Sequence, residues 1–109
     1  MALTIPFEIS VQELKQWMDA GKDFVLVDVR EPSEYTTANI GGKLIPLNTL
    51  PQHLAEFDSD AEIVVHCKLG GRSGQAVEFM RRNGLPKARN LRGGIIAWSK
   101  EIDPTVPQY

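Results

Sequence analysis

The sequence has little of what metal-binding, nucleic-acid-binding and membrane proteins need. Its one cysteine cannot form an internal disulfide, and one cysteine with two histidines is too few ligands for a zinc site. A formal charge of -2, with no Lys/Arg-rich run, gives no electrostatic footprint for DNA, RNA or an acidic membrane. No apolar run approaches the roughly 20 residues of a membrane span, and the start, Met1 to Pro6, lacks the layout of a secretory signal. We therefore expect a cytoplasmic protein that needs no metal and no organic cofactor and binds neither nucleic acid nor membrane.

The length and composition predict one compact domain over residues 1–109. An apolar fraction of 42% is ordinary for a globular protein that buries a core, and 109 residues leave no room for a second domain. Within such a core, Trp17 and Trp98 are most economically packing residues. The lone Cys67 is then either a small core residue or a reactive thiol.

Apolar periodicity predicts helices and strands in alternation. Ser10 and Glu13 have the spacing of a capping box, so a first helix should run to about Ala20 and end at Gly21. We expect strands at 24–27 and 62–66, a brief apolar stretch at 44–45 and a short edge strand at 89–91. Further helices are expected at 31–35, 50–57, 73–83 and 95–101. This order is typical of an α/β fold with a parallel sheet and right-handed crossovers.

The segment from Cys67 to Ser73 joins the second strand directly to the longest helix. In parallel sheets, sites form beyond the carboxyl ends of the strands. The paired glycines Gly70 and Gly71 let the backbone curl, so that several N–H groups can point inward and hold an anion. These amides, the helix N-terminus and the charges of Lys68 and Arg72 favour a Cys67 thiolate with a depressed pKa.

Other interpretations of this segment are weaker. A cysteine after a buried strand is ordinarily core filler, but filler does not require a glycine-rich turn with two cations. A nucleotide phosphate site at Gly70 and Gly71 is the other alternative, yet the seven residues lack the spacing of a Walker loop.

With these residues in place, the chain resembles the rhodanese homology family from about Phe7 to Trp98. Residues 28–35 (DVREPSEY) are similar to the first signature of that family, residues 67–73 (CKLGGRS) to its active-site loop, and residues 90–98 (NLRGGIIAW) to its closing signature. One departure occurs where many members have Gly-His-Ile, because this chain has Ala38, Asn39 and Ile40 there. Since Asn tolerates unusual backbone angles and bonds to nearby backbone, we interpret the change as structural.

The resemblance implies a central five-stranded parallel sheet flanked by helices on both faces. It implies a sulfurtransferase in which Cys67 takes a sulfane sulfur from thiosulfate or a protein persulfide and passes it to a thiophilic acceptor. The loop Lys68, Leu69, Gly70, Gly71, Arg72 and Ser73 would bind the anionic donor. Related phosphatases and arsenate reductases have five residues between cysteine and arginine, whereas four intervene here, which favours sulfur over phosphate or arsenate. A non-catalytic interaction module is disfavoured because Cys67 is present.

The last stretch, residues 97–109, is similar to the C-terminus of rhodanese domains fused to adenylyltransferases. This similarity implies a ubiquitin-like sulfur-carrier protein as acceptor and leaves a cysteine desulfurase possible as donor. The chain would be a free-standing relative or a domain excised from a fusion.

Several charged residues have both a functional and a structural interpretation. The end of the sheet that carries Cys67, formed by the carboxyl ends of the strands, also carries Asp28, Arg30 and Glu31. These residues can support the site, or they can form an ion-pair network in which Arg30 binds Glu31 or Glu34. His66 is expected to be structural, because successive strand side chains face opposite ways.

Arg72 and Lys68 remain open in the same way. A guanidinium can bond two oxygens of a sulfonate, so Arg72 is either a donor-binding group or a brace bonded to a carboxylate such as Glu31. Lys68 is either an electrostatic aid near the mouth of the site or an ordinary solvated lysine.

Overall fold

The computed structural model describes residues 4–109. Within them, five strands form one sheet in the order β1-β5-β4-β2-β3, with every neighbouring pair parallel. The strands are β1 (Glu8–Ile9), β2 (Val25–Asp28), β3 (Lys43–Leu44), β4 (Ile63–His66) and β5 (Ala88–Leu91). Residues 1–3 lie outside this description. They are part of the predicted domain and of the Met1–Pro6 segment that was compared with a secretory signal.

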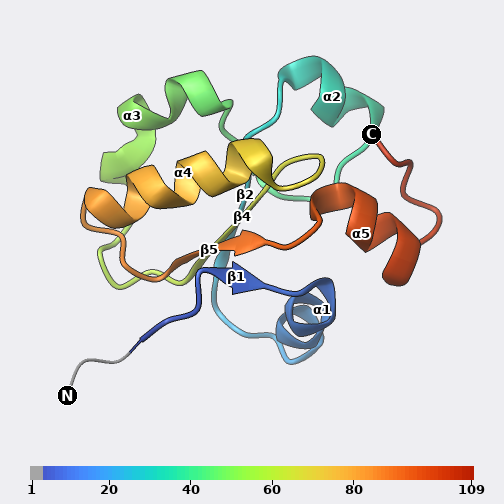
Figure 1. Ribbon diagram of the computed structural model, residues 1–109, viewed down its shortest axis with the longest axis horizontal. Coiled ribbons are helices and arrows are strands. Elements are labelled where there is room, and N and C mark those ends of the chain that lie inside the picture. Colours follow the sequence, from blue (N-terminus) through green and yellow to red (C-terminus); the bar gives the residue numbers. More distant parts are fainter. Residues whose placement is uncertain (1–3) are drawn as a thin grey trace.

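The α-helices of the described chain are α1 (Val11–Asp19), α2 (Pro32–Thr37), α3 (Leu50–His53), α4 (Gly71–Arg82) and α5 (Gly94–Glu101). Figure 1 shows α3 and α4 on one side of the sheet and α1 and α5 on the other. No helix within residues 4–109 is both long and apolar enough to cross a membrane. The predicted α/β fold with a five-stranded parallel sheet covered on both faces is confirmed.

Alternating strand side chains divide the core between these two layers of helices. One face of the sheet packs against α3 and α4 through a cluster that includes Val27, Val65, Leu50, Val77 and Met80. The other face packs against α1 and α5 through Ile9, Leu14, Val64, Leu91 and Trp98. Because β2 and β4 are covered on both faces, they consist of continuous apolar residues up to their carboxyl ends.

The predicted 89–91 strand exists as β5, but its predicted position at the sheet edge is wrong. β5 pairs with β4 on one side and with β1 on the other. The edge is β1, a two-residue strand that the sequence analysis did not predict. Two residues are too few to show the alternating apolar pattern of a strand, so β1 is defined by its pairing with β5. The predicted 50–57 helix divides into α3 and a 3₁₀ turn at Leu54–Glu56.

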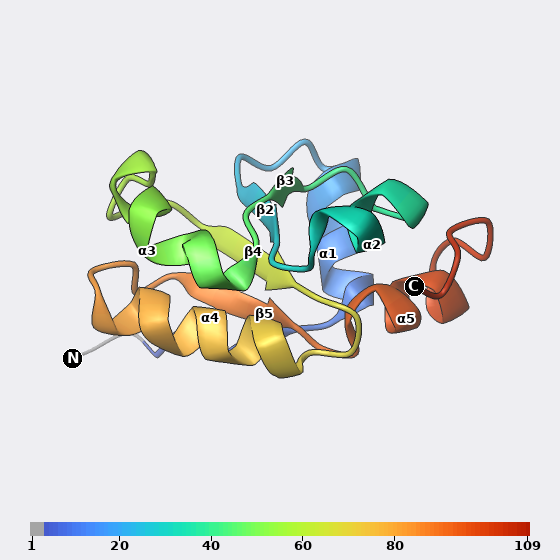
Figure 2. The ribbon, with the colours of Figure 1, turned by 90° about the horizontal axis from the view of Figure 1, so that it is seen from above.

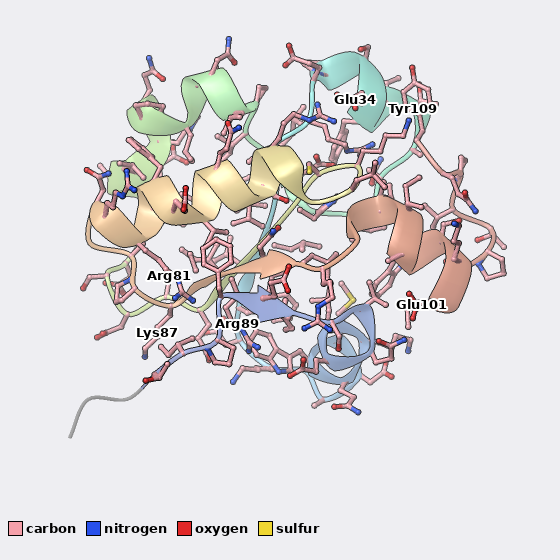
Figure 3. All side chains as sticks on the ribbon, in the orientation of Figure 1. Glu34, Arg81, Lys87, Arg89, Glu101 and Tyr109 are labelled. Atoms are coloured by element: carbon pink, nitrogen blue, oxygen red, sulfur yellow. The ribbon has the colours of Figure 1, made fainter. Side chains whose placement is uncertain are left out.

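The segment before β1 is fixed by Arg81, at the end of α4. Its guanidinium donates hydrogen bonds to the carbonyl oxygens of Ile5, Pro6 and Ala88, at 3.2, 2.9 and 2.8 Å. Figure 3 shows Arg81 between α4 and this segment, far from Glu34 on α2. One side chain therefore ties the first strand to the last helix–strand connection.

Candidate active site

The candidate site is the turn between β4 and α4. Cys67 follows the last residue of β4 directly, and α4 begins at Gly71. Gly70 has φ +121, a conformation that a residue with a side chain rarely adopts, so a glycine is needed here. The turn is closed by a hydrogen bond of 3.0 Å from the Gly74 N–H to the Gly70 carbonyl oxygen. Figure 2 shows the turn at the carboxyl end of β4, next to the segment that leads from β2 to α2.

Two groups donate hydrogen bonds to the sulfur of Cys67. The backbone N–H of Gly70 lies 3.0 Å from Sγ, and the hydroxyl of Ser73 lies 3.2 Å from it. The cysteine as a residue is 2% exposed, so its sulfur is largely withdrawn from water. A negative charge on the sulfur would be met by these donors rather than by solvent.

This environment lowers the pKa of the Cys67 thiol. Burial acts against ionisation, but the Ser73 hydroxyl and the backbone N–H groups of Ser73, Gly70 and Leu69 outweigh it, so the pKa lies below its ordinary value. The direction agrees with the expectation from the sequence. The groups responsible are mainly short-range donors, whereas the sequence analysis had also invoked the charges of Lys68 and Arg72.

The start of α5 shapes the same turn from the other side. The N–H groups of Ile95 and Ile96 donate to the carbonyl oxygens of Cys67 and Lys68, at 3.0 and 3.2 Å. Gly94 makes this approach possible, because a Cβ on it would lie 2.4 Å from the Lys68 carbonyl oxygen. The carbonyl groups of Cys67 and Lys68 are therefore directed at α5 and away from the sulfur.

A buried side chain from β5 also reaches the turn. Asn90, 5% exposed, donates from Nδ2 to the Gly70 carbonyl oxygen at 3.1 Å. Its Oδ1 lies 2.6 Å from the Ser73 hydroxyl. Asn90 thus contacts both residues that donate to the Cys67 sulfur. Asn90 belongs to the segment similar to the closing signature, but no part in the site was expected of it from the sequence.

Arg72 is bonded to a carboxylate, as in its structural interpretation, and the partner is Glu34 and not Glu31, which had been given as an example. The two terminal nitrogens of Arg72 lie 2.7 and 2.9 Å from the two carboxylate oxygens of Glu34 on α2. This bidentate bond lowers the pKa of Glu34 to about 2. The pair links α2 to the start of α4 beside the turn.

The remaining predicted loop residues lie around the mouth of the site. The side chain of Leu69 points outward and is 65% exposed. The ammonium group of Lys68 lies 5.8 Å from the centre of the Tyr109 ring. Gly71 is the first residue of α4 and has open space where a side chain would begin.

Asp28 and Arg30 form a buried ion pair at the carboxyl end of β2. Both are 0% exposed, and Arg30 Nη2 lies 2.7 Å from Asp28 Oδ2. The predicted partners of Arg30, Glu31 and Glu34, were therefore wrong. Its guanidinium also donates to the Ala38 carbonyl oxygen at 2.7 Å, so the pair anchors the end of α2.

His66 lies beside this pair. Its Nε2 is 3.5 Å from Asp28 Oδ2, and its Nδ1 is 3.2 Å from the Cys67 carbonyl oxygen. Burial lowers the pKa of His66 and outweighs the opposing effect of Asp28, so the ring is neutral near pH 7. These contacts are with backbone and with Asp28 and not with the sulfur, which agrees with the expected structural role.

A cleft of about 480 Å³ opens next to the turn. It is lined by Val29, Glu31, Leu47, Asn48 and Arg72. Glu31 is therefore on the cleft wall and exposed, whereas Asp28 and Arg30 are sealed beneath it. Among residues 4–109, no three His, Cys, Asp or Glu side chains converge in a way that could hold a metal ion.

The departure from the family pattern at Asn39 is local. Asn39 donates to the Tyr35 carbonyl oxygen and accepts from the Gly41 N–H, at 3.1 and 3.0 Å. It bonds to nearby backbone as expected, but within residues 4–109 positive φ angles occur at glycines, so Asn39 does not use an unusual conformation.

Known proteins are similar to this domain in both fold and sequence. The model of the rhodanese-like domain family matches residues 10–101, and the chain belongs to this family. A sulfurtransferase of Allochromatium vinosum is 36% identical over 100 residues, which cover 91% of this chain and 94% of the relative. The probable adenylyltransferase/sulfurtransferase MoeZ of Mycobacterium tuberculosis is 36% identical over 104 residues, or 93% of this chain. The chain spans 26% of the length of MoeZ.

Solved structures of similar domains agree closely with this fold. A rhodanese-like domain protein from Staphylococcus aureus has a TM-score of 0.80 at 34% identity, covering 92% of this chain and 95% of that one. A human single-domain sulfurtransferase also has a TM-score of 0.80, at 28% identity, covering 87% of this chain and 96% of that one.

Proposed function

We propose that this domain is a sulfurtransferase that carries a sulfane sulfur on Cys67 as a persulfide. The observation that carries the proposal is the pair of donors, the Gly70 N–H at 3.0 Å and the Ser73 hydroxyl at 3.2 Å, on a sulfur whose pKa is lowered. Such a thiolate is a nucleophile without a general base. The sulfurtransferases among the relatives support the same chemistry.

In the proposed first step, the Cys67 thiolate attacks the outer sulfur of thiosulfate. A bond forms between Sγ and this sulfur, the sulfur–sulfur bond of thiosulfate breaks, and sulfite leaves with the electron pair. The total charge is unchanged, since the persulfide anion keeps the charge that the thiolate had. The N–H groups around the turn can then stabilise the terminal sulfur as they stabilised the thiolate.

In the second step, a nucleophile such as cyanide attacks the terminal sulfur. The Cys67–sulfur bond breaks, its electron pair returns to Sγ, and the thiolate is restored for another cycle. The supporting residues act indirectly in this scheme. The Arg72–Glu34 and Asp28–Arg30 pairs hold α2 and the turn in place, and the cleft beside Arg72 admits the anionic donor.

Intact-mass measurement after incubation with thiosulfate tests the proposal. We expect a gain of one sulfur atom that is lost on adding cyanide, and no gain in Cys67→Ser. An unreactive thiol in a protein that hydrolyses p-nitrophenyl phosphate would instead support a phosphatase of the same fold. Four residues between Cys67 and Arg72, rather than five, argue against that alternative.

A protein is the more specific candidate for the acceptor. The similarity to MoeZ, and to a putative sulfur-carrier protein of Bacillus subtilis at 35% identity over 103 residues, favours a sulfur relay. The exposed Leu69 offers an apolar contact beside the turn. We therefore propose a ubiquitin-like sulfur carrier as acceptor and a persulfide-forming cysteine desulfurase as an alternative donor to thiosulfate, both in the cytoplasm.

Transfer to a carrier can be measured directly. The persulfidated domain is mixed with a sulfur-carrier protein whose C-terminus has been adenylated, so that the terminal sulfur displaces AMP and forms an acyl disulfide. A thiol reductant such as dithiothreitol then cleaves the sulfur–sulfur bond, and the carrier is analysed by mass spectrometry for a thiocarboxylate. Transfer to cyanide with no transfer to the carrier would restrict the domain to small acceptors.

A further inference from the structure

We propose that Asn90 is a positioning residue for the reactive sulfur, because its side chain contacts the Gly70 peptide, whose N–H donates to Cys67 Sγ, and the Ser73 hydroxyl, which lies 3.2 Å from Sγ. The proposal rests on the site assigned above but concerns the thiol itself, whichever sulfur donor or acceptor the domain uses. Asn90 comes from β5, a strand that contributes no atom to the turn, and its side chain spans from the turn to the first helical residues of α4.

The first link runs through Gly70. Asn90 Nδ2 donates to the Gly70 carbonyl oxygen, while the N–H of the same residue donates to Cys67 Sγ at 3.0 Å. Gly70 has φ +121 and could adopt many other conformations at little cost, so a residue of this kind needs an external contact to keep its N–H directed at the sulfur. The amide of Asn90 is such a contact.

The second link runs through Ser73. Its hydroxyl lies 2.6 Å from Asn90 Oδ1 and 3.2 Å from Cys67 Sγ, and Ser73 is 0% exposed. A hydroxyl has one hydrogen and two lone pairs. When the sulfur is a thiol, Ser73 can donate to Asn90 and accept from S–H. When the sulfur is a thiolate, Sγ and Asn90 Oδ1 share the one hydroxyl hydrogen, so Asn90 positions the hydroxyl and also competes with Sγ for its hydrogen. Asn90 keeps the hydroxyl in the position from which both arrangements are reached.

The orientation of the Asn90 amide is fixed by these two contacts together. With Nδ2 facing the Gly70 carbonyl oxygen, Oδ1 necessarily faces Ser73. The reversed orientation would place Oδ1 against the Gly70 carbonyl oxygen, with no hydrogen between two acceptors. Close packing adds to this, since a Cβ on Gly74 would lie 3.4 Å from Nδ2. The side chain therefore acts as a rigid bridge between the two donors.

Replacing Asn90 should weaken the Gly70 donor, but it should also free the Ser73 hydroxyl hydrogen for Sγ. In a Ser73→Ala background only the first effect remains, so Asn90→Ala should there raise the thiol pKa towards its ordinary value. In Asn90→Asp with Ser73 present the thiol pKa should also rise, because the carboxylate repels both the Gly70 carbonyl oxygen and the thiolate, and holds the Ser73 hydrogen more strongly. Below the pKa, the thiolate fraction should fall by up to about tenfold, which is the effect of one pKa unit.

The measurement is the rate of Cys67 alkylation by iodoacetamide as a function of pH, in the absence of any sulfur donor. Ser99→Ala is the matched control, because Ser99 is another buried polar residue, 3% exposed, whose hydroxyl donates to the Val106 carbonyl oxygen and not to the turn. It should leave the pH profile unchanged. A folded Ser73→Ala/Asn90→Ala protein with the same pH profile as Ser73→Ala would overturn the proposal.

A second measurement uses the unaltered protein and does not depend on the variants folding. The side-chain NH₂ resonances of Asn90 and the N–H resonance of Gly70 should shift with the same midpoint as the thiol titration. Asn90 resonances that do not respond to thiol ionisation would also overturn the proposal. Failure of persulfide formation with an intact Asn90 effect would instead count against the proposed sulfur transfer, so the two can be told apart.

Discussion

Gly94 approaches Lys68 so closely that a Cβ on Gly94 would lie 2.4 Å from the Lys68 carbonyl oxygen and 2.5 Å from that of Cys67. The φ of Gly94 is +58, which adds backbone strain for any residue with a side chain. Both obstacles are backbone atoms of the turn, so they cannot rotate away as a side chain could. The contact between α5 and the turn therefore depends on this glycine.

We expect Gly94→Ala to lower the free energy of unfolding by about 2 kcal/mol, as overpacking does, and to slow alkylation of Cys67. The control is Gly84→Ala, at a similarly positive φ of +92 but with nothing within 4 Å. It should cost about 1 kcal/mol in strain and leave Cys67 unaffected. Urea denaturation and alkylation rates give the two quantities. Equal effects of the two substitutions on Cys67 would contradict this account.

The Arg72–Glu34 pair should make stability depend on pH in acid. Arg72 holds the pKa of Glu34 at about 2 in the folded protein, below its ordinary value of 4.5. The ionised carboxylate therefore stabilises the fold above pH 4.5, and this contribution is lost as the pH falls from 4.5 towards 2. Glu34→Gln should cost about 1 kcal/mol at pH 7, since Arg72 is partly exposed, and almost nothing near pH 2.

Urea denaturation of both proteins across this pH range measures the difference. Asp19→Asn serves as the control, because Asp19 pairs with Lys15 on the surface, with 62% and 46% of the two side chains exposed. Its effect should be close to zero throughout. A constant deficit of Glu34→Gln at every pH would show that the ionised pair is not the cause.

Replacing one partner of the Asp28–Arg30 pair should strongly lower the free energy of unfolding. Asp28→Ala leaves the guanidinium of Arg30 buried without its carboxylate, and such a change typically costs about 3–5 kcal/mol. The double variant Asp28→Ala/Arg30→Met removes both charges and should recover much of this loss. Thermal or urea denaturation compares the two. A double variant less stable than Asp28→Ala would mean that Arg30 stabilises the fold chiefly through Ala38.

Arg81 should control the order of the first strand. Arg81→Ala removes hydrogen bonds to the carbonyl oxygens of Ile5, Pro6 and Ala88, for an expected loss of about 1–2 kcal/mol. Hydrogen exchange should quicken at the N–H groups of Asn90 and Arg92, which bond to carbonyl oxygens of residues 7 and 9. Arg82→Ala, at an exposed position of the same helix, is the control.

The parts of the fold that could be predicted from the sequence are those with strong local patterns. β2 and β4 are continuous apolar runs, and the Ser10–Glu13 capping box is present with both of its hydrogen bonds. The helix after Cys67 was predicted to start at Ser73 but begins at Gly71. Glycine has low helix propensity, so its place in the first turn is decided by the tertiary contacts of the turn.

The partners of the charged side chains could not be predicted. Arg30 was expected to bind Glu31 or Glu34, which are close to it in sequence, and Arg72 a carboxylate such as Glu31. The actual choice follows from packing, because Arg30 turns into the core towards Asp28 while α2 presents Glu34 to α4. Sequence spacing does not contain this information.

Asn90 was missed for a related reason. An asparagine within a predicted strand is a signal if that strand is interior, since a buried amide needs partners. The strand was assigned to the edge of the sheet, however, where an amide could face water. The interior position of β5, between β1 and β4, places Asn90 beside the turn.

The turns at the amino ends of β2 and β4 lie at the end of these strands that is opposite to Cys67. Residues 22–25 and 58–62 meet there around a hollow of about 460 Å³. Each strand places four residues, roughly 13 Å of extended chain, between this end and the reactive turn. Loops here can be lengthened, or an affinity tag or second module grafted, at a distance from the chemistry. This end of the domain is therefore the natural attachment point for engineering.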